Sequence, residues 1–190
     1  DGIVRFNGDI QRLLLNLDTD LKGEQIPEGK YNALMHTDLK NQLNIQDFNG
    51  QVMNGAVALN GLVNWHHHVS WDIKGRLEHL DPKDKALPQI ARDFLPPNID
   101  ANIHSRGSME KGLEMNAQLA FDQYESWAVQ LNQAKAKNNK VQPMFLDVAW
   151  QGIDRAVPYI GWLSSAEGHT KVALKDTQQD IEVSTTVRAH

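Results

Sequence analysis

The stretch VALNGLVNWHHHVSWDIKGRL, residues 57–77, decides the fold of this chain. Every second residue in it is apolar, except at Gly61, His67 and Gly75. Successive side chains of a β-strand point to opposite faces of a sheet, so a period of two gives each strand one apolar and one polar face. The stretch therefore predicts half-buried strands on both sides of the three histidines.

The same alternation returns in residues 113–121, 144–150 and 181–187. Most links between candidate strands are short and rich in Gly, Asn, Asp and Pro, which is typical of an antiparallel meander. We predict strands over residues 3–8, 11–18, 31–37, 42–48, 51–59, 60–66, 69–79, 99–106, 112–121, 126–132, 144–151, 169–175 and 180–188. This is far more strand than an ordinary domain carries, and it favours an elongated all-β body.

Asn-Gly pairs are strong turn signals, and they occur at residues 7–8, 49–50, 54–55 and 60–61. They lie too close together for all of them to be two-residue hairpins. Some must therefore be bulges or glycines inside strands.

One short helix is predicted near residues 82–94. Asp81-Pro82 is a good helix start, and Ala86, Ile90 and Phe94 form an apolar stripe. Pro88 inside this segment predicts either a late start or a bent first turn.

The composition excludes several classes of protein. The net charge is −5 and Lys and Arg are scattered, so there is no basic face to follow a nucleic acid. No apolar stretch approaches the roughly 20 residues of a membrane-spanning helix, so the fragment itself is expected to be soluble. The absence of cysteine excludes disulfides and thiolate metal sites. The chain starts at Asp1 without an initiator Met or signal peptide, and we interpret residues 1–190 as a single fragment of a longer protein.

No motif for bond-making chemistry is present. His66 and His68 share a face in an extended segment, but without a third ligand a solvated turn is the simpler interpretation, and no metal is predicted. There is no nucleophile elbow, no phosphate-binding loop and no recognisable catalytic carboxylate pair, so we expect neither an enzyme nor a cofactor. A sugar-stacking platform is the alternative for the tryptophans, although most of them keep register with apolar neighbours and suit a core or a groove lining. They are Trp65, Trp71, Trp127, Trp150 and Trp162.

The apolar face of such strands must meet something. Periodicity by itself favours the core of a closed β-sandwich. The other solution is an open, curved sheet whose apolar concave face is left for a guest, and periodicity does not separate the two.

Several segments resemble the repeating unit of the TamB family, a component of the translocation and assembly module of Gram-negative bacteria that is related to AsmA-like proteins. The resemblance covers roughly residues 57–188, while the first 56 residues fit by general character only. Lys175, where a glycine is expected, and the lack of a proline at residues 66–68 depart from the pattern. The segments that carry the resemblance are LNGLVNW (59–65), WDIKGRL (71–77), LDP (80–82), LPPNIDANI (95–103), SRG (105–107), VAW to Pro158 (148–158) and SAEGH (165–169).

The resemblance implies a β-taco, a long and mostly antiparallel U-shaped sheet with an apolar inner groove. It implies a place in the periplasm, within a full-length protein that is anchored at the inner membrane and reaches an Omp85-type outer-membrane assembly protein. It further implies a role in outer-membrane biogenesis, either in protein transport and assembly or in lipid transport.

On this basis we predict a non-enzymatic conduit in which the groove shields phospholipid acyl chains. The predicted lining residues are Val63, Trp65, Val69, Trp71, Ile73, Leu77, Leu113, Met115, Leu119, Phe121, Leu146, Val148, Trp150, Val183 and Val187. One alternative is a chaperone that pairs its sheet edge with strands of a nascent outer-membrane β-barrel. The other is an ordinary β-sandwich that binds a sugar or a protein.

Overall fold

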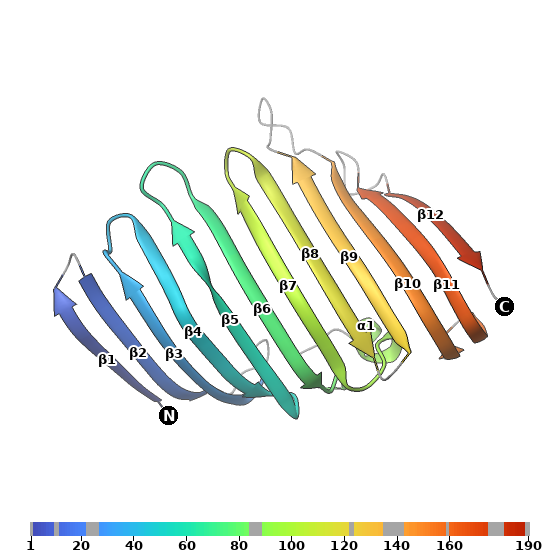
Figure 1. Cartoon of the computed structure of the whole chain (residues 1–190), viewed down its shortest axis with the longest axis horizontal. Helices are drawn as coiled ribbons and strands as arrows, with labels where there is room; N and C mark the ends of the chain where they lie inside the picture. The colour runs from blue at the N-terminus through green and yellow to red at the C-terminus, as the bar shows by residue number, and fades with distance from the viewer. Residues whose placement is uncertain are drawn as a thin grey trace.

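The computed structural model describes residues 2–9, 12–21, 27–83, 89–121, 124–134, 143–158, 160–174 and 181–188. Within these residues the chain forms one 12-stranded sheet, in which every strand pairs antiparallel with its neighbours in chain order (Figure 1). The strands are β1 (Gly2–Asp9), β2 (Arg12–Leu21), β3 (Gly29–Thr37), β4 (Gln42–Val52), β5 (Gly55–Asn64), β6 (Ser70–Leu80), β7 (Ile99–Ser108), β8 (Gly112–Phe121), β9 (Glu125–Ala134), β10 (Met144–Val157), β11 (Gly161–Leu174) and β12 (Ile181–Arg188). The prediction of an elongated all-β fold is confirmed.

The predicted boundary between strands 51–59 and 60–66 is wrong. Strand β4 continues to Val52, and β5 runs without a break through Asn60 and Gly61. The chain reverses instead at Met53 and Asn54, whose φ angles of 51° and 61° suit the tight primed turn of a two-residue hairpin. Of two competing Asn-Gly signals, the one at residues 54–55 therefore marks the turn, and the one at 60–61 lies inside a strand.

A short helix is present in the predicted region. Helix α1 covers Gln89–Phe94, and residues 84–88, which include Ala86 and Pro88, lie outside the described part of the chain. Asp81 does not begin a helix: its carboxylate accepts a hydrogen bond of 3.0 Å from the Lys83 N–H within a turn. Asx turns of this kind compete with helix capping at such residues.

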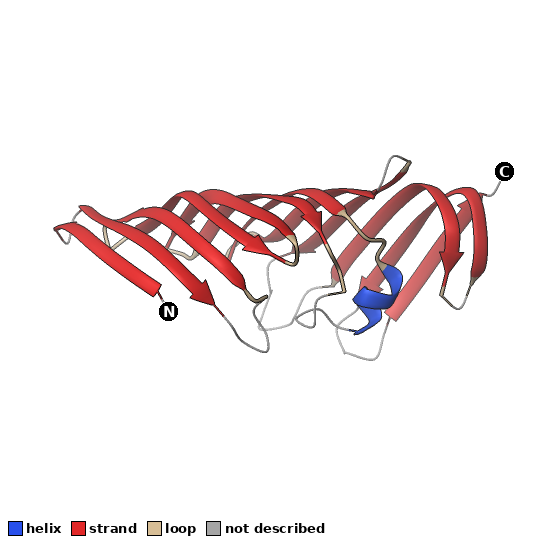
Figure 2. Cartoon of the chain, turned by 90° about the horizontal axis from the view of Figure 1, so that it is seen from below, coloured by secondary structure: helices blue, strands red, loops and turns tan. Residues whose placement is uncertain are grey.

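The pairing register separates the side chains into two faces. Residues paired across strands share a face, so the pairs Val63–Trp71, Trp71–Gly107 and Trp127–Trp150 trace one apolar face across the sheet. Figure 2 shows the sheet arched over helix α1, so the face beneath the arch is concave. Phe94 of the helix packs against Ile153 and Val157 of the apolar face, which identifies that face as the concave one.

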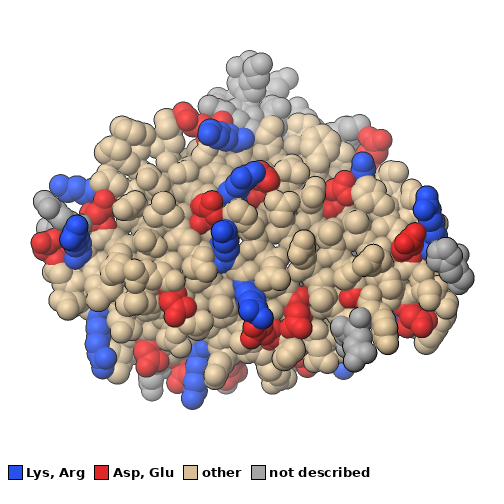
Figure 3. All heavy atoms as spheres, in the orientation of Figure 1, with Lys and Arg blue, Asp and Glu red and all other residues tan. Residues whose placement is uncertain are grey.

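The opposite, convex face carries the polar side chains. Asp72, Arg106, Glu114 and Asp147 are among them, and Figure 3 shows acidic and basic residues dispersed over this face. Among the described residues there is one sheet and no second layer of strands. The closed β-sandwich that periodicity favoured is therefore wrong, because a meander whose strands pair only with their chain neighbours leaves one sheet with two open faces.

Packed cores occur along one rim of the concave face. The larger core joins Tyr31, Val52, Leu80, Ile99 and Phe121, and a smaller one joins Ile153, Val157 and Ala166. These residues lie at or near the strand ends that form the lower rim in Figure 1. The other strand ends, at Asn64, Ser70, Ser108, Gly112 and Met144, form the upper rim.

Candidate functional site: the concave apolar face

The structure brings most of the predicted lining residues onto one surface. The register places Val63, Trp71, Ile73, Leu77, Leu113, Met115, Leu119, Phe121, Leu146, Val148, Trp150, Val183 and Val187 on the concave face. Trp65 and Val69 lie in the connection between β5 and β6 instead, because the strands stop at Asn64 and resume at Ser70. Val69 is among the exposed large hydrophobic residues.

The concave face also continues through strands in which no lining residue was predicted. In β2 it carries Leu13, Leu15 and Leu17, an alternation that the neighbouring Leu14 obscures. In β4 it carries Leu43 and Ile45 and then, after a β-bulge at residues 46–47, Phe48 and Val52. Because the bulge adds one residue, the concave side chains are at odd positions before it and at even positions after it. A simple count of every second residue therefore assigns the second half of β4 to the wrong face.

The lining residues differ in how much surface they leave open. Phe121 is 0% exposed and packs edge-on against Trp127, with ring centroids 5.2 Å apart. Leu77 and Leu119 pack against the same core. Val63, Met115 and Leu146, nearer the upper rim, are partly buried like Leu77 and Leu119 but belong to neither packed core. The accessible apolar surface therefore lies toward the upper rim, and the lower rim is filled by the protein itself.

Two tryptophans lean across the boundary between neighbouring strands. Trp71 lies directly opposite Gly107 and Trp150 directly opposite Gly168. A methyl group built on Gly107 would come 2.6 Å from the Trp71 ring, and one on Gly168 would come 2.2 Å from the Trp150 ring. The glycines thus leave room for the indoles, a cross-strand arrangement known to compensate for the weak strand propensity of glycine.

Among the described strand residues, Glu125 and Arg155 are the charged side chains on the concave face. The guanidinium of Arg155 donates to Glu125 through Nε (2.8 Å to Oε2) and Nη2 (3.0 Å to Oε1). Nη2 also donates to the Phe94 carbonyl at 3.2 Å, and the Trp127 indole N–H donates to Glu125 at 2.9 Å. The charges of this ion pair therefore have partners within the protein, and the pair lies at the lower rim.

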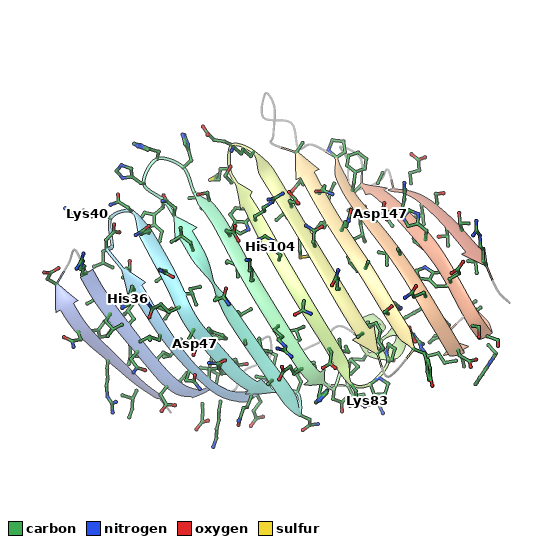
Figure 4. All side chains as sticks on the ribbon, in the orientation of Figure 1. His36, Lys40, Asp47, Lys83, His104 and Asp147 are labelled. Atoms are coloured by element: carbon green, nitrogen blue, oxygen red, sulfur yellow. The ribbon has the colours of Figure 1, made fainter. Side chains whose placement is uncertain are left out.

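The convex face holds ion pairs between neighbouring strands. His104 lies 2.8 Å from Asp72, Arg106 binds Glu114 at 2.7 Å, and His169 pairs with Asp147. Hydrogen bonds from the Arg106 side chain, followed by one from Asn116, hold the pKa of Glu114 below its ordinary value of 4.5. His36, His104 and Asp147 project from this face in Figure 4. All of these groups are on the opposite side of the sheet from the apolar surface.

The three histidines at residues 66–68 lie in the loop between β5 and β6. His68 pairs with Glu110 at 3.0 Å across two neighbouring loops, and the rings of His66 and His67 lie 4.1 Å apart. No cluster of three or more His, Cys, Asp or Glu residues able to hold a metal ion occurs in the described ranges. These loops border an open pocket of about 900 Å³ at the upper rim.

Each end of the sheet presents an edge strand. Within the part of the chain that the structure describes, β1 pairs only with β2 and β12 only with β11. Exposed apolar side chains accompany both edges, Val4 and Phe6 on β1 and Val183 and Val187 on β12. Such edges are able to pair with a further strand.

An open, arched meander with one continuous apolar face and one charged face defines a class of extended β-sheet proteins that leave the inside of the sheet accessible. The chain matches the family described as TamB, N-terminal domain, over residues 1–144, and it belongs to that family. The match includes the first 56 residues and leaves residues 145–190 outside. Comparison with curated proteins and with solved structures gave no match.

The family has a known location and role in the cell envelope. TamB proteins are non-enzymatic envelope components that span the periplasm, function in outer-membrane assembly or lipid transport, and work with an Omp85-type partner. The described residues contain no helix that is long and apolar enough to cross a membrane.

Proposed function

We propose that this chain is a segment of a lipid conduit in the periplasm, whose concave face shields phospholipid acyl chains between the inner and outer membranes. One observation carries the proposal: the apolar face continues across all the strands, and on that face the described strand residues form one ion pair, whose charges satisfy each other. Each methylene kept from water contributes roughly 0.8 kcal/mol, so a long apolar face stabilises an acyl chain without any specific contact.

The geometry suits transfer as well as binding. Similar apolar contacts recur from strand to strand, so a chain moved by one strand spacing meets nearly the same environment. The polar head group would remain in water beyond the upper rim, where the face is accessible. In this proposal the full-length protein is anchored at the inner membrane and reaches the Omp85-type partner at the outer membrane.

Val148 and Ala149 offer a matched test, because they are adjacent in β10 and point to opposite faces. A photo-crosslinking residue placed at Leu146 should capture phospholipid in the unmodified chain. Val148→Asp should lower the adduct yield by about tenfold or more, since an unpaired charge on this face costs more than about 1.4 kcal/mol. Ala149→Asp should leave the yield unchanged. Equal yields from both folded variants would refute the conduit.

A second function, that of a chaperone for strands of a β-barrel, is favoured by the exposed edges of β1 and β12. It requires backbone pairing at an edge and tolerates polar substitutions on the concave face. A crosslinker at Ser184 of β12 that captures nascent barrel strands, together with full crosslinking in Val148→Asp, would support the chaperone over the conduit.

A further inference from the structure

The connection between β6 and β7 does not stay between those two strands. It leaves β6 at Leu80, passes through helix α1, and enters β7 at Ile99. Phe94, near its end, packs against Ile153 and Val157 of β10 and Ala166 of β11, three and four strands beyond β7. Figure 2 shows the helix beneath the arch, on the concave side.

The connection is held at both ends. At its start the Asp81 N–H donates to the Met53 carbonyl at 2.8 Å, and Pro82 is fully buried. At its end Leu95 packs against the larger core, and the Phe94 carbonyl accepts a hydrogen bond from Arg155. The helix is thereby fixed across the lower rim of the concave face.

Arg155 is the residue that joins the helix to the sheet by polar contacts. Its side chain is about one quarter exposed, while that of Glu125 is 8% exposed. The same carboxylate accepts from Trp127, which packs with Phe121 in the larger core. Arg155, Glu125, Trp127 and the end of α1 therefore form one packed unit.

We propose that Arg155 is a positioning residue that holds helix α1 as the lower wall of the acyl-chain path. The path then follows the open surface near the upper rim, past Trp71, and excludes the surface around Trp127. The inference rests on the proposed lipid conduit, and it adds which part of the concave face the lipid uses and which residue sets that limit.

Two single-tryptophan forms of the 190-residue chain test this. One keeps Trp71 and the other keeps Trp127, with the remaining tryptophans replaced by phenylalanine. The probe is a phosphatidylcholine brominated on its acyl chains, since bromine quenches an indole only at short range. We expect strong quenching of Trp71 and weak quenching of Trp127.

Releasing the helix should remove the protection of Trp127. The double variant Arg155→Met with Glu125→Gln removes both charges and keeps an acceptor for the indole N–H. This double variant should raise the quenching of Trp127 severalfold and leave the quenching of Trp71 unchanged. Phe94→Ala should also raise the quenching of Trp127, because it removes the apolar contact between the helix and Ile153 and Val157. The single variant Arg155→Lys keeps a cation beside Glu125, so Trp127 should stay partly protected from quenching. The control is Arg106→Met with Glu114→Gln, which removes an ion pair from the convex face and should leave Trp127 protected.

The outcomes separate the two proposals. Absence of quenching at Trp71 in the folded chain would refute the lipid conduit itself. Equal quenching of Trp71 and Trp127 in the two single-tryptophan forms without further substitution would leave the conduit standing and refute the wall. The double variant Arg155→Met with Glu125→Gln and the variant Phe94→Ala should each keep a cooperative thermal transition. If Trp127 stays protected from quenching in both, the role of Arg155 is refuted.

Discussion

At the residue scale, Glu125 and Arg155 are unusual because they place two charges on the otherwise apolar concave face. A buried carboxylate is tolerated when a guanidinium binds it with two hydrogen bonds and other donors complete its coordination. Glu125 has both, from Arg155 and from Trp127. The pair connects elements distant in the chain, since Arg155 also reaches the Phe94 carbonyl.

We predict that Arg155→Met alone destabilises the fold by about 3–5 kcal/mol, because it leaves Glu125 buried without its partner. Adding Glu125→Gln should recover much of that loss. Urea denaturation followed by circular dichroism measures both. If Arg155→Met alone is as stable as the double variant, the Glu125 carboxylate does not need Arg155 as a partner.

A pH effect is expected on the convex face. The pKa of Glu114 is lower in the folded chain than in the unfolded one, so its pairing with Arg106 contributes to stability above the unfolded value. That contribution is lost as the pH falls below about 4.5 and through the lowered pKa. NMR titration of the Glu114 carboxyl should give a midpoint below 4.5, and Arg106→Met should raise it. An unchanged midpoint in the variant would contradict the assigned cause.

At the scale of elements, the bulge in β4 decides which side chains face the guest. Ile45 pairs with Gly61 and Phe48 pairs with Leu59, so residues 46 and 47 together oppose Asn60. The extra residue keeps Phe48 and Val52 on the same face as Leu43 and Ile45. In β9, by contrast, the alternation runs without interruption from Glu125 to Gln133.

Deletion of Gln46 should therefore be tolerated, since the regular strand that results still turns Phe48 to the concave face. Deletion of Gln130 from the uninterrupted β9 should turn one half of that strand to the wrong side and abolish the cooperative thermal transition. Calorimetry of the two deletions compares them directly. Equal damage from both would contradict the assigned register.

At the scale of the whole molecule, the described strands pair only with their neighbours in chain order, and the connection through α1 adds a contact between more distant segments. The larger core draws its buried residues from β3 to β8, whereas the residues of β1 are exposed throughout. Stability should consequently be graded along the sheet, since local opening follows the density of buried contacts.

Native-state hydrogen exchange should find the amides of β1 and β12 exchanging fastest and those of β6 to β9 slowest. Uniform protection across the sheet would show instead that the structure opens as a single unit.

Much of the strand content and the identity of the two faces could be predicted because alternation is a local property of each strand. The residues from Leu113 to Phe121 and from Met144 to Trp150 show this most clearly, since both runs are regular and both face the concave side. Prediction failed where a local signal had a competitor, as at Asn54-Gly55 and Asn60-Gly61. It also failed where Leu14 and the bulge in β4 masked the period.

The amino-acid sequence by itself determined that this chain forms amphipathic antiparallel strands, because each residue's place in the period of two settles its face. Only the tertiary structure decided that the sheet stays open, that helix α1 lies under β10 and β11, and that Glu125 meets Arg155. Those outcomes depend on which distant segments pack together and on how far the connection after Leu80 reaches. No local period encodes such contacts, because they join residues that are separated by tens of positions in the chain.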